Sequence, residues 1–221
     1  MHAREGNFFF LLMGLLALLL AGPLTFEIVG YTTGTLVSVA FSATLIIGIW
    51  SFVESRRWFI TGVVLAAASL AITLLGIFLP ENPLNSFYLD LLDLSIALIF
   101  CGLSLVFALR QVFTGTAMTL NRMTGAVCVY LLLGISLGII NLFIYKLVPG
   151  SFKGISDSAD LTAGLDLFYY TFVTMTTLGY GDITPVRPLA RAVAYMTAVG
   201  GQFYIAILVG MLVGLYLKKS D

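Results

Sequence analysis

One stretch of this sequence decides how the rest is interpreted: Thr176-Thr177-Leu178-Gly179-Tyr180-Gly181-Asp182. Gly179 and Gly181 alternate with larger residues, and glycine adopts left-handed backbone conformations at little cost. Such alternation allows successive backbone carbonyls to point to the same side of the chain. Carbonyls arranged in this way around an axis replace the water oxygens that a cation gives up when it is dehydrated. The stretch therefore predicts a cation-binding loop made of backbone.

The composition places this loop in a membrane protein. Of the 221 residues, 60% are hydrophobic and 10% are charged, and the mean hydropathy is +1.05. A soluble domain of this size cannot bury so much apolar surface, whereas a lipid bilayer accommodates it. The formal net charge is +0 and the sequence contains no block of basic residues, so nucleic acid is not a predicted partner. The predicted environment is membrane lipid.

Six apolar segments are long enough to be membrane spans, and they cover residues 7–28, 35–53, 58–79, 88–109, 123–148 and 189–217. The apolar stretch 164–176 is too short to cross about 30 Å of hydrocarbon, so it predicts a re-entrant helix that leads into the loop. The predicted fold class is an all-α membrane protein. It has six transmembrane helices, with the re-entrant helix and its loop between the last two.

The basic residues predict the orientation of these spans. Seven of the eleven basic residues fall on one side of the six-span arrangement: Arg4, Arg56, Arg57, Arg110, Arg122, Lys218 and Lys219. The positive-inside rule then places both termini in the cytoplasm. An alternative interpretation treats the first segment as a cleaved signal peptide, but no cleavage pattern stands out near Ala21-Gly22-Pro23. We expect the segment to be retained, in what the sequence suggests is a prokaryotic plasma membrane.

Residues 123–217 resemble the pore module of potassium channels, in the order outer helix, pore helix, selectivity filter and inner helix. The resemblance implies a homotetramer, because one filter strand cannot surround an ion, and it argues against an enzyme. It implies that K⁺ is the bound ion and that no organic cofactor is needed. The implied ion-binding residues are Thr177, Leu178, Gly179, Tyr180 and Gly181, with the Thr177 hydroxyl as an extra ligand and Thr176, Asp182 and Tyr170 as filter support.

Some details of the filter region differ from relatives of this kind. The resemblance implies that Asp182 lies behind the filter and bonds to Tyr170, where many relatives carry tryptophan. Val173 stands where some of them have a glutamate that pairs with this aspartate, so that pair is impossible here. Leu178 replaces the commoner valine. Tyr180 is retained, which favours potassium over sodium, and we expect its ring to pack against the re-entrant helix.

The last span contains candidate gating residues. Gly201 aligns with the hinge glycine of potassium channels, and close helix packing is an equally weighted alternative for this residue. Helical spacing from Gln202 predicts a stripe that lines the cavity and the inner gate, formed by Gln202, Ile205, Ala206, Val209 and Val213.

The remaining sequence divides into two predicted domains. Residues 1–114 form a four-span scaffold in the position of a voltage sensor, and residues 115–221 form the pore domain. The span 88–109 contains no basic residue, so it lacks the arginine ladder that voltage sensing needs. We expect no cytosolic ligand-binding domain, and we expect weak or absent voltage gating.

Acidic side chains allow more than one interpretation. We interpret Asp90 and Asp93 as interfacial residues, with a role as polar partners or cation attractors as the alternative. Asp157, Asp160 and Asp166 either raise the cation concentration at the outer mouth or belong to a solvated loop without special function. Two other functions also remain open, namely an ion-translocating transporter and a non-conducting subunit that assembles with another channel.

Overall fold

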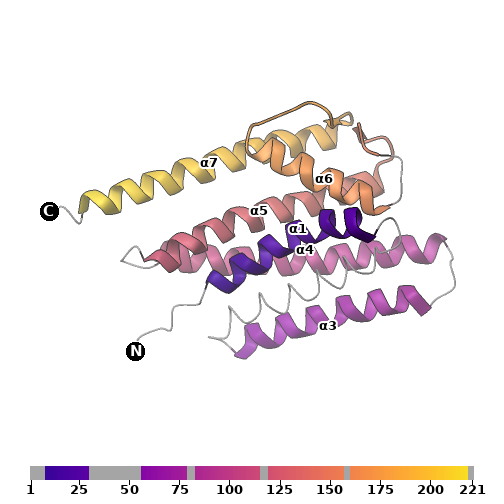
Figure 1. Ribbon diagram of the computed structural model, residues 1–221, viewed down its shortest axis with the longest axis horizontal. Helices are drawn as coiled ribbons and strands as arrows, with labels where there is room; N and C mark the ends of the chain where they lie inside the picture. The colour runs from indigo at the N-terminus through magenta and orange to yellow at the C-terminus, as the bar shows by residue number, and fades with distance from the viewer. Residues whose placement is uncertain (1–7, 30–55, 79–82, 115–118, 157–159, 219–221) are drawn as a thin grey trace. The chain divides into compact units, whose positions relative to one another are not determined.

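The computed structural model describes residues 8–29, 56–78, 83–114, 119–156 and 160–218, and these are almost entirely helical (Figure 1). In chain order the elements are α1 (Phe8–Val29), α3 (Arg56–Phe78), α4 (Pro83–Thr114), α5 (Leu120–Leu147), β1 (Phe152–Lys153), α6 (Asp160–Met175), β2 (Thr184–Pro185) and α7 (Pro188–Lys218). The predicted span 35–53 lies outside the described residues.

Four of the described helices contain segments long and apolar enough to cross a membrane: Phe8–Ile28, Phe87–Phe113, Leu120–Leu147 and Pro188–Met211. The α3 helix contains a shorter apolar segment, Ile60–Ile72. At this level the expected helical membrane protein is confirmed. One detail was not foreseen, because β1 and β2 form a short antiparallel pair in a chain that was expected to be all-α.

The chain forms two compact units, Met1–Val106 and Phe107–Asp221, and the boundary between them lies within α4. The sequence-based division was drawn after residue 114 instead. The end of α4 belongs with the second unit for a clear reason. The buried Arg122 side chain, in the first turn of α5, donates a hydrogen bond to the Val112 carbonyl near the end of α4. A cation at this position complements the negative end of the helix dipole.

Within the first unit, a polar contact joins α3 to α4. The Ser69 hydroxyl donates a hydrogen bond of 2.6 Å to Asp93 Oδ1, and Ser69 is buried. This hydrogen bond supports the alternative interpretation of Asp93, as a polar partner for a neighbouring helix. The contact gives the first unit a directional link between two largely apolar helices.

The second unit contains α5, α6 and α7, each of which contacts the other two. The α5 helix begins after Thr119, whose side chain accepts a hydrogen bond of 3.3 Å from the Arg122 backbone N–H. The short α6 helix lies beside α5 and α7, and α7 continues well beyond it (Figure 1). The predicted re-entrant stretch 164–176 corresponds to α6, which has 16 residues and is too short to span a bilayer.

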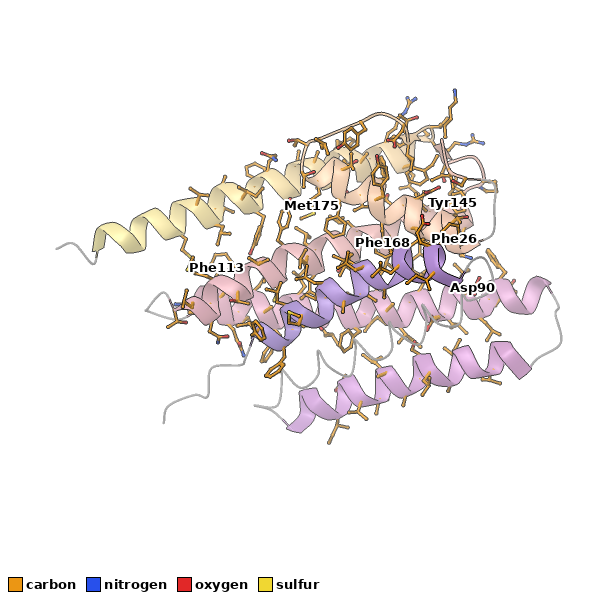
Figure 2. All side chains as sticks on the ribbon, viewed as in Figure 1. Phe26, Asp90, Phe113, Tyr145, Phe168 and Met175 are labelled. Carbon is orange, nitrogen blue, oxygen red and sulfur yellow. The ribbon has the colours of Figure 1, made fainter. Side chains whose placement is uncertain are left out.

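Two glycines of α5 allow α6 to approach closely. A Cβ atom at Gly134 would lie 2.5 Å from Phe172 Cε1, and one at Gly138 would lie 2.6 Å from Phe168 Cδ1. Both rings come from α6, on which Figure 2 labels Phe168 and, at the end of the helix, Met175. Small residues spaced by four allow membrane helices to pack at short distance. The aromatic rings of α6 therefore occupy notches in the surface of α5.

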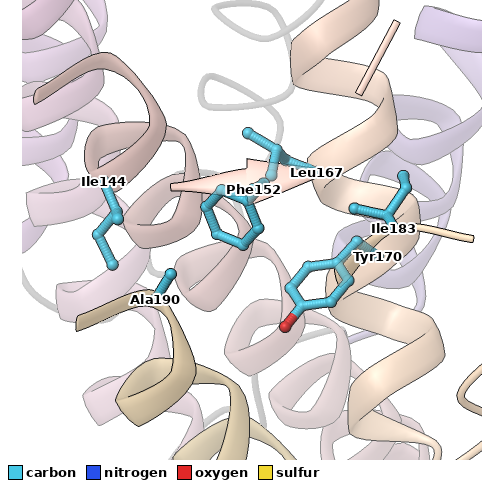
Figure 3. Close-up of a cluster of buried hydrophobic side chains, with 6 residues drawn as sticks. All are labelled: Ile144, Phe152, Leu167, Tyr170, Ile183 and Ala190. Carbon is cyan, nitrogen blue, oxygen red and sulfur yellow. The ribbon is translucent and has the colours of Figure 1, made fainter. Parts of the chain in front are cut away.

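A buried cluster holds the loops near the start of α7. It consists of Ile144, Phe152, Leu167, Tyr170, Ile183 and Ala190 (Figure 3). Phe152 and Tyr170 meet edge to face, with ring centroids 5.4 Å apart. Phe152 also belongs to β1, which pairs with β2 in the register Phe152↔Pro185 and Lys153↔Thr184. The cluster therefore ties the loop before α6 to the segment that follows the predicted filter.

Candidate functional site

The loop after α6 turns its backbone N–H groups back toward that helix. The Thr177 N–H donates to the Thr174 carbonyl at 3.0 Å, and the Leu178 N–H donates to the Val173 carbonyl at 3.0 Å. The Gly179 N–H donates to the same Val173 carbonyl at 3.3 Å. In a trans peptide the carbonyl points away from the N–H of the next residue. The carbonyls of residues 176, 177 and 178 are therefore directed away from α6.

The backbone of this loop alternates in handedness. Thr177, Gly179 and Gly181 have positive φ angles of 60°, 58° and 82°. Left-handed glycines were expected at 179 and 181, and the structure has both in that conformation. Thr177 was not expected there, because a β-branched residue pays about 1–2 kcal/mol to adopt it. Such an outlier points to a functional constraint on the backbone.

The outer end of the loop is fixed by hydrogen bonds to Asp182. The Tyr169 hydroxyl donates to Asp182 Oδ2 at 2.7 Å, and the Ile183 N–H donates to Oδ1 at 3.0 Å. The hydrogen bond from Tyr169 holds the pKa of the Asp182 carboxyl below its ordinary value. The carboxylate is thus ionised over the physiological pH range.

The predicted bond between Asp182 and Tyr170 is wrong, because the partner is the preceding tyrosine. Adjacent residues on a helix point about 100° apart, so only one of the two can face the loop. Tyr169 does so, and its ring stacks on Tyr180 with centroids 6.4 Å apart and planes inclined by 12°. Tyr170 faces the other way and is buried against Phe152. It supports the site through packing rather than through a hydrogen bond to Asp182.

The loop between α5 and α6 also contacts the outer end of the site. Gly154 has a φ of +88°, and a Cβ atom there would overlap the Asp182 carbonyl oxygen. The Ser151 carbonyl accepts a hydrogen bond of 2.8 Å from the Val186 N–H, and Ser151 is fully buried. The segment from Asp182 to Val186 is therefore held from two directions, by α6 and by this loop. Sequence reasoning missed Gly154, because nothing local distinguishes it from other loop glycines.

The predicted site residues from Thr176 to Asp182 are exposed on the surface of the single chain. Thr176 Oγ1 donates back to the Phe172 carbonyl at 2.8 Å, which extends the hydrogen bonding of α6 by one residue. Leu178 and Tyr180 are 55% and 66% exposed. The loop thus presents an open backbone surface whose rear side is attached to α6.

The inner-helix residues fall into two groups. Gly201 packs directly against the end of α6, where a Cβ atom would overlap the Met175 carbonyl oxygen and lie 2.8 Å from Met175 Cγ. This contact favours the packing interpretation of Gly201 over the hinge. Gln202, Ile205 and Val209 are exposed on the chain, whereas the side chain of Val213 lies outside the described part.

Taken together, these features are those of a pore domain, in which a half-length helix and a carbonyl-lined loop lie between two long apolar helices. Residues 126–218 match a family model described as "Ion channel". A protein from Oryza sativa subsp. japonica, "Two pore potassium channel c", is 31% identical over 77 residues, which are 35% of this chain and 16% of that protein. No solved structure matches the chain.

Residues 126–218 are thus similar to ion channels of this family, and the similarity covers most of α5 together with α6, the loop and α7. The alignment spans less than a fifth of the length of the rice relative.

Proposed function

We propose that this protein is a subunit of a K⁺-selective channel that conducts ions passively through a tetrameric pore. The direction of the carbonyls of residues 176–178 is the observation that carries the proposal. A row of backbone carbonyl oxygens can coordinate a dehydrated monovalent cation in place of its water molecules. The name of the rice relative also supports potassium as the ion.

The carbonyls of Thr177, Leu178, Gly179 and Tyr180 form the ion sites in this proposal, together with the Thr177 hydroxyl. A single chain provides one strand of oxygens, so ligands on all sides of an ion require about four copies around an axis. The exposed face of residues 176–182 supports this arrangement, because it is the face that would line the axis. No organic cofactor has a part in this mechanism.

The inner helix lines the cavity below the filter. The exposed side chains of Gln202, Ile205 and Val209 support this role, since they share a helical stripe that Val213 would extend. A ring of Ile and Val side chains can close a pore by excluding water. Gly201, which is packed against Met175, then serves as a fixed point above this gate.

The first half of the chain completes a subunit of six spans with both termini in the cytoplasm. The helix α4 supports a scaffold role for it, because its apolar segment Phe87–Phe113 has a single basic residue, Arg110, near its end. Moving one charge through the membrane field yields about 2.3 kcal/mol per 100 mV, so several charges are needed for steep gating. This half therefore acts as a scaffold in a prokaryotic plasma membrane.

Flux through purified protein in liposomes tests the proposal, with K⁺ and Na⁺ measured separately. Gly179→Asp is the decisive variant, and Gly150→Asp is its matched control. Both glycines have positive φ, of 58° and 69°, and at neither position would an added Cβ atom have a neighbour within 4 Å. We expect K⁺-selective flux in the wild type and in Gly150→Asp, and none in Gly179→Asp.

Each other outcome has a defined meaning. Flux that survives Gly179→Asp would show that the loop is not the ion path. Equal flux of K⁺ and Na⁺ would refute potassium selectivity. Confirmed tetramers that carry no flux in any variant would favour the non-conducting subunit that assembles with another channel.

A further inference from the structure

A buried hydrogen bond joins α5 to α6 away from the filter. Asn141 and Thr171 are both 0% exposed, and Asn141 Nδ2 donates to Thr171 Oγ1 at 2.9 Å. The Thr171 hydroxyl in turn donates to the Leu167 carbonyl at 2.6 Å. The hydroxyl hydrogen is therefore already engaged within α6, and the oxygen is left to accept the bond from the Asn141 amide.

The surroundings of this bond are apolar. Thr171 shares one face of α6 with Phe168 and Phe172, the rings that occupy the notches at Gly138 and Gly134. Apolar contacts have no preferred direction, so rings in shallow notches tolerate small rotations and shifts. A hydrogen bond requires a defined distance and angle. The Asn141–Thr171 bond is a directional contact within this helix crossing.

A shift of α6 by one turn would break the bond without replacing it. Four residues before Thr171 lies Leu167, which has no polar side-chain atom, and four residues after it lies Met175, whose thioether is only a weak acceptor for the amide. The Asn141 amide would then be buried in an apolar environment without a partner, which is strongly unfavourable. Asn141 Oδ1 already has no hydrogen-bond partner among the described residues. A polar residue kept at such a cost is typical of contacts that specify one packing arrangement.

The position of α6 determines the position of the filter backbone. The Val173 carbonyl, two residues after Thr171, accepts both the Leu178 and the Gly179 N–H groups. Rotation of α6 about its axis would move this carbonyl and the loop residues attached to it. We propose that Asn141 is a positioning residue for ion selectivity, which fixes the rotation and depth of α6 through Thr171. The inference rests on the proposed function as a K⁺ channel.

The test compares K⁺ and Na⁺ flux in liposomes for four variants: Asn141→Leu, Thr171→Val, the double variant and Thr171→Ser. We expect each of the first two to lower the K⁺/Na⁺ flux ratio by about tenfold, the range expected for loss of one buried hydrogen bond. The double variant should be no worse than either single variant, because both remove the same bond. Thr171→Ser retains the hydroxyl and should remain close to the wild type.

A matched control distinguishes this bond from any buried hydroxyl. Ser136 is buried on α5, and its hydroxyl donates to the Leu132 carbonyl of the same helix at 2.7 Å. Ser136→Ala removes a buried hydrogen bond that does not reach α6, so we expect an unchanged flux ratio. For variants that reconstitute poorly, the second measurement is the rise in thermal midpoint of the detergent-solubilised protein when Na⁺ is replaced by K⁺. A misplaced filter should lose this rise.

Several results would overturn the inference. The first is that Asn141→Leu and Thr171→Val leave both the K⁺/Na⁺ flux ratio and the K⁺-dependent rise in thermal midpoint unchanged. The second is that the double variant lowers the flux ratio by the product of the two single effects. An equal loss in Ser136→Ala would show a general packing effect instead. A wild-type protein that neither selects nor is stabilised by K⁺ would refute the proposed function itself, and this failure is visible without any variant.

Discussion

The contact between Gly154 and the Asp182 carbonyl provides a sharp test of how the outer end of the filter is held. In Gly154→Ala the new Cβ would overlap the carbonyl oxygen and lie 3.0 Å from the carbonyl carbon and 3.3 Å from Ile183 Cα. Ordinary contact begins at 3.4 Å, so the backbone must move by at least 3.4 − 3.0 = 0.4 Å at the carbon and by more at the oxygen. Neither atom can rotate away as a side chain would.

Gly150→Ala separates this overlap from backbone strain. Gly150 and Gly154 both have positive φ, of 69° and 88°, so alanine costs about 1–2 kcal/mol at either position. At Gly150 nothing lies within 4 Å of the added atom. We expect Gly154→Ala to lower the free energy of unfolding by about 1–3 kcal/mol more than Gly150→Ala, in the range of overpacking in a tight site.

Two assays measure this difference. Thermal unfolding of the purified protein in detergent reports the change in stability, and K⁺ efflux from liposomes reports the state of the filter. We expect Gly154→Ala to reduce efflux, because displacement of the Asp182 carbonyl moves the end of the filter, and Gly150→Ala to conduct like the wild type. Equal behaviour of the two variants in both assays would refute the argument that the loop holds the filter.

Three further predictions concern Asp182, the inner helix and voltage. The pKa of Asp182 is lower in the folded protein than in the unfolded chain. The stability that its carboxylate contributes is therefore present above the unfolded-state pKa and is lost as the pH falls through the folded-state pKa. We expect flux to stay constant from pH 7 to 5 and to fall only below about pH 4. Tyr169→Phe removes the hydrogen bond that is the main cause of the lowered pKa, so the fall in flux should move to higher pH in this variant. An unchanged pH profile would contradict the assignment of Asp182 as the titrating group. Gly201→Ala should destabilise the protein by about 1–3 kcal/mol, because the added Cβ atom would overlap Met175. Gly200→Ala should be neutral or slightly stabilising, because the space around its Cβ position is open. Unfolding experiments that rank the two variants in the opposite order would exclude this packing. Single-channel recordings should show an open probability that varies little with voltage, and a steepness of several elementary charges would contradict the scaffold role of the first half.

The short helix and the glycine-containing loop of the candidate site were predictable from the sequence, because their signals are local. The glycines at 179 and 181 and a helix too short to span a bilayer both appear within one stretch of about twenty residues. The helical segments followed from long apolar runs in the same way. Such features need no knowledge of which distant residues meet.

The details that sequence analysis missed depend on side-chain direction or on distant contacts. Tyr169 and Tyr170 are adjacent and chemically identical, so the residue that faces Asp182 depends on the rotation of α6. That rotation is fixed by α5, through contacts such as Asn141–Thr171 that are thirty residues apart in the sequence. The interpretations of Gly201 were likewise balanced until the contact with Met175 was known.

The packing of α6 between its neighbours has a consequence for how the protein is made. The helix is held on one side by the glycine notches of α5 and on the other by Gly201 of α7, which follows α6 in the chain and is synthesised after it. A segment of 16 residues cannot remain in the bilayer as an independent span, and its loop has polar backbone that lipid does not solvate. On the proposed function, the loop at residues 176–182 therefore acquires its shape only after α7 has entered the membrane. A nascent chain halted before that point would contain α5 without a formed ion path.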